Sequence, residues 1–252
     1  MTTYDIHFEP HSVDSGHATA WLARGWGLFM TAPAVWIAIG VVFAVIHGLL
    51  GMVPVLGRVA HMLLLPVFAA GLMEASRIAE SGAPLPFDAL FAGFRGRTGK
   101  LVMVGLLALG AFVAIGVIAF VIVLVGGGAG TFSALKHIAA AGTSAAVTTS
   151  GASIGLALGS LLLASLVTLL LLVPLTMALW FAPALVYFDG MEPLAAMKSS
   201  LVAGIHNWLA LFVYGILAFV LMCIAAITVV GLLVIVPLIA TSAYLSYRDI
   251  FH

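Results

Sequence analysis

The stretch 208–245 contains no charged residue. As one α-helix it would be about 57 Å long, whereas the hydrocarbon core of a bilayer is only about 30 Å thick. We therefore expect a hairpin of two membrane-spanning helices that turns near Gly231. Because a soluble core does not require an apolar run of this length, the stretch restricts the fold to that of a membrane protein.

The overall composition supports the same class. Hydrophobic residues make up 64% of the chain and charged residues 7%, against about 45–50% and about 25% in soluble domains. Lipid must therefore cover most of the surface. Nine basic and nine acidic residues cancel, so no excess of positive charge points to nucleic acid. The single cysteine, Cys223, cannot form an internal disulfide.

Six stretches are apolar and long enough to cross a membrane, each with about 20 residues or more. They are residues 33–55, 59–79, 99–125, 154–187, 207–228 and 231–248. The fourth is too long for one upright crossing. It contains Pro174 and Pro183, which favour a kink because proline removes a backbone donor. We expect an all-α polytopic membrane protein whose first helix is retained rather than cleaved as a signal peptide.

The basic residues predict the orientation, since cytoplasmic loops of membrane proteins are enriched in lysine and arginine. With the N-terminus and the C-terminus both in the cytoplasm, only Arg58 and Lys136 fall outside. Seven bases then fall inside: Arg24, Arg77, Arg95, Arg97, Lys100, Lys198 and Arg248. Six spans preserve this bias. Five spans with one re-entrant segment are the alternative.

The chain also contains a candidate internal repeat. "FDALFAGFRGRTGKL" (87–101) aligns without gaps on "LAAMKSSLVAGIHNW" (194–208), and nearly the same shift places Pro66 on Pro174. We predict a pseudo-threefold repeat of a short amphipathic helix, an outward span and a returning span. The predicted divisions are a cytoplasmic tail at 1–17, a single membrane domain at 18–248 with units at about 18–82, 83–189 and 190–248, and a periplasmic loop at 126–150. Any two membrane hairpins resemble one another, which is the simpler explanation.

The predicted short helices each have one apolar stripe, so they are expected to lie along the membrane surface. Trp21 and Trp26 belong to the first stripe, and Phe91 and Phe94 to the second, where they recur with Phe87 and Leu90 at helical spacing. The third stripe is Leu194, Met197, Leu201 and Ile205, with Lys198 beside it. Tryptophan suits this depth because its ring is apolar and its N–H is polar.

Glu74 and Arg77 form the first candidate polar site. They are three residues apart and can pair on one helix face. Intramembrane charges are functional candidates by default. However, Glu74 lies about 12 Å along the helix from Pro66. If Pro66 is near the middle of the membrane, Glu74 is close to the cytoplasmic interface. An interfacial pair and a site facing a cavity both remain open. Thr176 could add to a polar track through the fourth span.

Glycines also mark a candidate packing surface. Gly151, Gly155 and Gly159 recur at a spacing of four residues, which predicts a groove where another helix can approach closely. That helix could belong to the same chain or to a second copy, so a homo-oligomer stays open.

Neither a metal nor another cofactor is expected. The eight histidines lack the converging ligands that zinc or haem sites use. The tail "YDIHFEPH" (4–11) alternates polar and apolar residues, and could be loose, docked, in contact with a partner or bound to a metal ion.

The segments "WLARGWGLFMTAPAVW", "LPVFAAGLMEASRIAESGAPLPFDALFAGF" and "MALWFAPALVYFDGMEPLAAMKSSLVAGIHNW" resemble a family of uncharacterised six-helix inner-membrane proteins of proteobacteria. These are similar in layout to YciC-like proteins and to the membrane domain that precedes some glycerophosphodiester phosphodiesterases. The resemblance covers residues 18–248 and implies a six-helix inner-membrane protein. It transfers no catalytic residue, because its motifs are helix-end aromatics, prolines and short amphipathic helices.

Three functions are compatible with the sequence. The first is a non-enzymatic accessory subunit or scaffold of a larger membrane complex, in contact with membrane lipids and other integral membrane proteins. The alternative is a transporter or lipid-handling protein for an apolar or lipid cargo, since proline-broken spans are common in transporters. A membrane enzyme fits least, because no cluster of catalytic residue types shares one depth.

Overall fold

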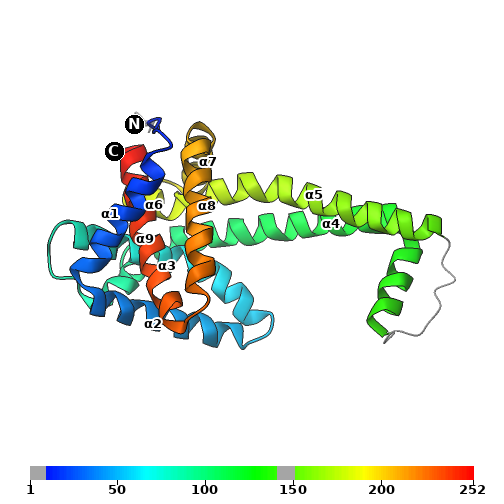
Figure 1. The fold of residues 1–252 in the computed structure, drawn as a ribbon, viewed down its shortest axis with the longest axis horizontal. Helices are drawn as coiled ribbons and strands as arrows, with labels where there is room; N and C mark the ends of the chain where they lie inside the picture. The colour runs from blue at the N-terminus through cyan, green and yellow to red at the C-terminus, as the bar shows by residue number, and fades with distance from the viewer. Residues whose placement is uncertain (1–9, 141–150) are drawn as a thin grey trace. The chain divides into compact units, whose positions relative to one another are not determined.

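The computed structural model describes residues 10–140 and 151–252, and in these ranges it contains helices and no strand (Figure 1). The chain divides into two compact units, of which the first is Met1–Leu109 with Met177–His252 and the second is Gly110–Thr176. The helices are α1 (His17–Thr31), α2 (Pro33–Gly51), α3 (Leu56–Glu80), the 3₁₀-helix η1 (Phe87–Phe94), α4 (Thr98–Ala140), α5 (Gly151–Trp180), α6 (Ala182–Tyr187), α7 (Pro193–His206), α8 (Trp208–Ala225) and α9 (Val229–Phe251).

Six of the described helices are long and apolar enough to span a membrane, which confirms the six predicted spans. They are Pro33–Gly51, Leu56–Glu80, Thr98–Gly126, Leu158–Tyr187, Trp208–Ala225 and Gly231–Phe251. The predicted ends agree to within a few residues, because lipid selects for length and apolarity and both can be read from the sequence.

Helix α9 is the central element of the first unit. It packs against α1, α2, α3 and α8, and Figure 1 shows it in red among them. Small residues allow this close packing. A methyl group placed on Gly25 of α1 would lie 3.0 Å from the Ser242 backbone nitrogen, and one placed on Gly40 of α2 would lie 2.9 Å from the Leu233 carbonyl oxygen. Helix backbones therefore approach α9 where glycine replaces a side chain.

Helix η1 packs on α3 through two glycines. A methyl group on Gly71 would lie 1.9 Å from the Leu90 carbonyl oxygen, and one on Gly93 would lie 2.2 Å from that of Val67. This segment is a 3₁₀-helix rather than the predicted α-helix, so the α-helical spacing of the predicted stripe does not apply here. Leu90 is fully buried, but Phe87 and Phe94 of the same predicted stripe are exposed.

The fourth span breaks between α5 and α6, as its prolines predicted. Pro183 lies in the first turn of α6, and Phe181 connects the two helices. The buried hydroxyl of Ser200 lies in the break: it accepts a hydrogen bond from the Phe181 N–H (3.0 Å) and donates one to the Met177 carbonyl (2.6 Å). The Ser200 side chain of α7 thus replaces one backbone hydrogen bond of the helix, and both backbone groups keep a hydrogen-bond partner.

The second unit contains parts of α4 and α5. Gly128 has a φ of +57° and interrupts α4, and the backbone is helical from there to Ala140. Part of the predicted 126–150 loop is therefore helix, and residues 141–150 lie outside the described residues. A methyl group on Gly126 would lie 2.8 Å from Ser160 Cβ, so these two residues mark the close contact within this unit.

Short helices occur at the three predicted positions, as α1, η1 and α7, and each is followed by a span. In α7 the protein buries the small residues Ala196, Ser200, Ala203 and Gly204, together with Pro193 and Met197. Of the predicted apolar stripe, Met197 is therefore covered by the protein, whereas Leu194 and Ile205 are exposed.

Candidate functional site at the ends of the returning spans

The end of α9 joins the ends of the other returning spans through acidic side chains. Glu80, the last residue of α3, accepts a hydrogen bond from the Tyr244 hydroxyl (3.0 Å) and pairs with Arg248. Both partners come from α9, more than a hundred residues along the chain. The end of α3 is therefore fixed to the end of α9 by an aromatic donor and a cation.

Two further acids have partners of the same kinds. Asp189, just after α6, accepts a 2.6 Å hydrogen bond from the Tyr247 hydroxyl and lies 3.4 Å from His252. Asp249 accepts from the Trp21 indole N–H at 2.9 Å and from Arg24 at 3.2 Å. We call these three sets the acid triads: Glu80–Tyr244–Arg248, Asp189–Tyr247–His252 and Asp249–Trp21–Arg24.

In each acid triad the acid is more buried than its basic partner. The exposed fractions of the acidic side chains are 24% for Glu80, 7% for Asp189 and 18% for Asp249, whereas their basic partners are 40–44% exposed. Buried carboxylates require such partners, because an unpaired charge removed from water is costly. The basic groups consequently form the outer layer at the ends of these spans.

The predicted pair Glu74–Arg77 is confirmed. Both oxygens of Glu74 accept from the Arg77 guanidinium, at 2.6 and 2.8 Å, in a bidentate arrangement. Glu74 is 13% exposed and Arg77 is 55% exposed, so the pair repeats the pattern of the acid triads. Arg77 extends outward from an acid that lies against the protein, which is the behaviour of a long basic side chain near a helix end.

The residues expected at the membrane interface lie in different surroundings. Trp21 differs from the prediction, because it is fully buried and its N–H contacts Asp249. Trp26 and Phe94 are 46% and 40% exposed, Phe91 is half-buried and Lys198 is exposed. Thus α1 directs one tryptophan into the protein and the other outward, a difference that apolar periodicity could not predict.

The remaining predicted residues belong to the second unit. Thr176 donates its hydroxyl to the carbonyl of Val173 in its own helix. No described atom would lie within 4 Å of a methyl group on Gly155 or Gly159, so the groove there is open among the described residues. The Gly151 side of that groove lies outside what the structure describes.

The described part of the N-terminal tail is docked beside the acid triads. Asn207, which is 2% exposed, accepts from the Val13 N–H and donates to the His11 carbonyl, at 2.8 and 2.9 Å. His11 also donates its N–H to Ile250 at the end of α9 (2.8 Å). Residues 1–9 of the predicted tail, with most of its alternating pattern, lie outside the described residues.

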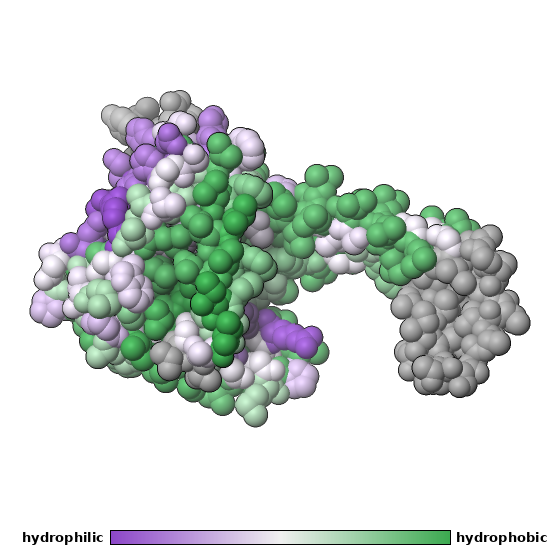
Figure 2. Space-filling view, viewed as in Figure 1, coloured by the Kyte–Doolittle hydropathy of each residue, from purple (hydrophilic) through white to green (hydrophobic). Residues whose placement is uncertain are grey.

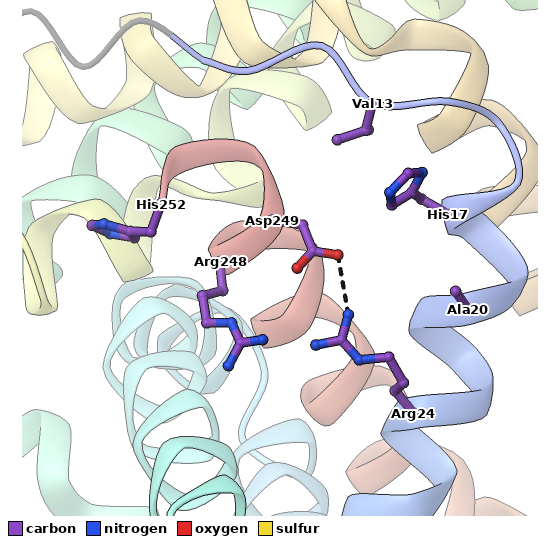
Figure 3. Close-up of a pocket in the computed structure, with 7 residues that line it drawn as sticks. All are labelled: Val13, His17, Ala20, Arg24, Arg248, Asp249 and His252. Atoms are coloured by element: carbon purple, nitrogen blue, oxygen red, sulfur yellow. Dashed lines mark hydrogen bonds and ion pairs between the residues drawn. The ribbon is translucent and has the colours of Figure 1, made fainter.

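This docked segment borders an open hollow of about 620 Å³ beside α1 and the end of α9 (Figure 3). Its walls carry positive, negative and apolar side chains. The lining residues are Val13, His17, Ala20, Arg24, Arg248, Asp249 and His252. The hollow therefore contains members of all three acid triads.

Two acids outside the spans have shifted pKa values. The backbone N–H of Gly16 and the Ser15 hydroxyl lower the pKa of Asp14, which holds the turn before α1. A hydrogen bond from Arg95 lowers the pKa of Asp88 at the start of η1. Both carboxylates are thus held in the charged form by local donors, as expected for turn residues.

Sequence reasoning did not find the acid triads. Their acids are far from their aromatic partners in the sequence, so no local spacing connects them. One signal was available: the end of α9 reads "YLSYRD", which places two tyrosines, a base and an acid where a span should meet the headgroups. Buried tyrosines seek hydrogen-bond partners, and this could have suggested acids at the ends of the neighbouring spans.

The comparisons with known proteins agree with this architecture. No protein-family model matches the chain, and no solved structure matches it. A probable inner membrane protein of Burkholderia thailandensis is 30% identical over 224 residues, which cover 89% of this chain and 79% of that protein. With six helices of spanning length in the described residues, the chain belongs to the family of that protein and is a multi-pass inner-membrane protein.

Proposed function

We propose that the protein has no catalytic activity and acts as an accessory subunit or scaffold in a larger inner-membrane complex. The acid triads carry this proposal. Glu80, Asp189 and Asp249 are each held by an aromatic donor and a basic group, and most of these partners come from another helix. These contacts join the ends of different helices, which is the structural role expected of a scaffold.

Polar groups within the spans support a scaffold over a transporter. Ser165 and Thr176 donate their hydroxyls to carbonyls three residues earlier, at 2.8 Å. Hydroxyls in this arrangement have their hydrogen-bond partner in their own helix and so do not require one from a cargo. Transport of an apolar or lipid cargo was the alternative, and these bonds do not favour it.

Helix α8 supplies the kind of surface that lipids or another membrane protein would cover. Only 17% of this span is buried by the described protein, and Figure 2 shows the apolar colour over it. Its large exposed residues are Trp208, Leu209, Phe212, Ile216, Phe219, Val220, Met222 and Ile224. Membrane lipids and other integral membrane proteins are therefore the proposed partners. A homo-oligomer would form through the same exposed apolar side chains.

The pseudo-threefold repeat is part of the proposal. The element order supports it, because a short helix and two spans follow one another three times in the described chain. Each returning span also holds a proline, at Pro66, Pro174 and Pro237. The exposed apolar residues of α1, η1 and α7 support their placement along the membrane surface.

Co-purification tests the proposed role. A chromosomally tagged protein is extracted with its surrounding lipid by an amphipathic polymer, and proteins in the particles are identified and quantified by mass spectrometry. We expect a membrane protein in constant stoichiometry, and the double variant Phe212→Ala with Phe219→Ala tests whether α8 contacts it. Particles that hold only this chain and lipid, at native expression, would contradict an accessory subunit.

Cysteine labelling tests the proposed orientation. In a Cys223→Ser background, Val53→Cys lies in the turn before α3 and Ser81→Cys lies just after it; both positions are exposed. With cytoplasmic termini, a membrane-impermeant maleimide should label Val53→Cys in cells with a permeabilised outer membrane. It should label Ser81→Cys only after the inner membrane is opened. The reverse pattern would place both termini in the periplasm.

A further inference from the structure

The hollow beside α1 and the end of α9 has unused hydrogen-bonding groups of both charges. Figure 3 shows Arg24, Arg248 and Asp249 among the residues that line the hollow, with the Arg24 guanidinium paired with the Asp249 carboxylate. We propose that this hollow binds a phosphoethanolamine group, as a lipid headgroup or as the free compound. The proposal is independent of any role as an accessory subunit.

The two arginines fit the phosphate. Arg24 is 43% exposed and Arg248 is 40% exposed. Each donates to a carboxylate through Nη1, and their other N–H groups have no partner among the residues that the structure describes. A guanidinium presents several donors in a planar fork that matches phosphate oxygens. A phosphate bound in the hollow would therefore use donors that the two lining arginines leave available.

The carboxylate of Asp249 makes the ligand more specific. Its Oδ2 atom accepts from both Trp21 and Arg24, whereas Oδ1 has no partner within the described ranges. A phosphate alone would bring a second negative charge beside this oxygen. A ligand with a primary ammonium beside its phosphate would neutralise the carboxylate and donate to Oδ1. The pairing of two guanidinium groups with one carboxylate thus favours an aminophosphate over a simple anion.

The position of the hollow at the end of α9 favours a membrane lipid as the source of the phosphoethanolamine group. The span Gly231–Phe251 includes Arg248 and Asp249 in its last turn, and a span of this length places its end where the hydrocarbon meets the headgroups. On α1, Trp26 lies two residues after Arg24 in the sequence and is exposed. Exposed aromatic residues are typical of the headgroup depth. A volume of about 620 Å³ leaves room for a headgroup while its acyl chains remain in the bilayer.

Native mass spectrometry of the full chain, purified in detergent and stripped of lipid, tests the proposal. Phosphatidylethanolamine, phosphatidylglycerol and phosphatidylcholine with identical acyl chains are titrated separately. Phosphatidylglycerol lacks an amine, and the quaternary ammonium of phosphatidylcholine has no N–H to donate. We expect phosphatidylethanolamine to bind about tenfold more tightly than the other two, the effect of one charge-assisted hydrogen bond. Equal binding of all three lipids would overturn the proposal.

Soluble phosphoethanolamine distinguishes the two sources. If the free compound binds with the same affinity as the lipid and displaces it, the acyl chains contribute nothing and the ligand is the free compound. If it competes only at much higher concentration, the ligand is the lipid. Both results support the assigned chemistry. Failure to compete at any concentration, together with equal binding of the three lipids, would contradict it.

Two variants locate the site, with a matched control elsewhere. Arg24→Gln should weaken phosphatidylethanolamine binding about tenfold. Asp249→Asn keeps the shape of the side chain and should abolish the preference over phosphatidylglycerol. Arg95→Gln also removes an exposed arginine with one acidic partner, but outside the hollow, and should change neither value. Thermal unfolding confirms that each variant is folded. Equal effects of Arg24→Gln and Arg95→Gln would place the binding elsewhere.

Discussion

Helices α8 and α9 are neighbours in sequence and pack against one another, yet they face different surroundings. The protein buries 61% of the α9 span and only 17% of the α8 span. The more buried helix is also the more polar: α9 contains the buried residues Thr241, Ser242 and Ser246, while the exposed side chains of α8 are almost all large and apolar. In this protein, as in membranes generally, polar and small residues mark the helix that contacts other helices.

The largest effect is expected where α1 packs closely on α9. Gly25→Leu introduces a side chain where a methyl group would already lie 3.0 Å from the Ser242 backbone. We expect it to lower the free energy of unfolding by about 3 kcal/mol, because packed interiors do not accommodate extra volume. Unfolding by SDS titration in mixed micelles measures this. Gly215→Leu on α8 is the control and should be neutral. A methyl group on Gly215 would lie within 4 Å of no described atom beyond its own stretch of helix.

An intermediate effect is expected at the acid triads. Glu80→Ala removes the acceptor of Tyr244 and the partner of Arg248, but Arg248 can turn toward water. The expected loss is about 1.5 kcal/mol in the same titration, between the values for a buried and an exposed ion pair. Asp88→Ala removes an exposed pair with Arg95 and should leave unfolding unchanged. If both variants lose the same stability, the acid triads do not hold the helix ends.

A smaller effect is expected at the polar contact between the two neighbours. The Tyr214 hydroxyl of α8 lies 2.8 Å from Ser242 Oγ in the interior. Tyr214→Phe removes that hydroxyl, while Ser242 keeps its bond to the Leu238 carbonyl. We expect a loss of about 1 kcal/mol, the value of one buried neutral hydrogen bond. Ser242→Ala on the same background should then add little, since the two groups act as a pair.

The smallest effect is expected on the outer face of α8. Phe219 is 68% exposed, so Phe219→Ala exchanges one apolar surface for another in contact with lipid or detergent. The free energy of unfolding should change by less than about 0.5 kcal/mol. A loss comparable to that of Gly25→Leu would show that this face is packed against protein in the unfolding assay.

The spans, the break near Pro183 and the Glu74–Arg77 pair could be predicted because each depends on residues close together in sequence. The length of an apolar stretch was sufficient to predict a span, a proline to predict the break, and a spacing of three residues to predict the ion pair. The acid triads could not be predicted, since Glu80 meets Tyr244 only after the spans have packed. Nor could the contact of Ser200 with the α5–α6 break, where one hydroxyl of α7 replaces a backbone bond. Lipid dictates local sequence patterns, whereas helix pairing depends on contacts between distant residues.

The central position of α9 has a consequence for biosynthesis. The ribosome completes α1 and α3 before α9, so Trp21 and Glu80 enter the bilayer without Asp249, Tyr244 and Arg248. Until α9 is inserted, these polar groups lack their partners, and the ends of the earlier helices are not held together. A nascent chain at this stage is a substrate for the insertion machinery or for quality-control proteases. Truncation before α9 should therefore lead to rapid degradation rather than to a smaller stable protein.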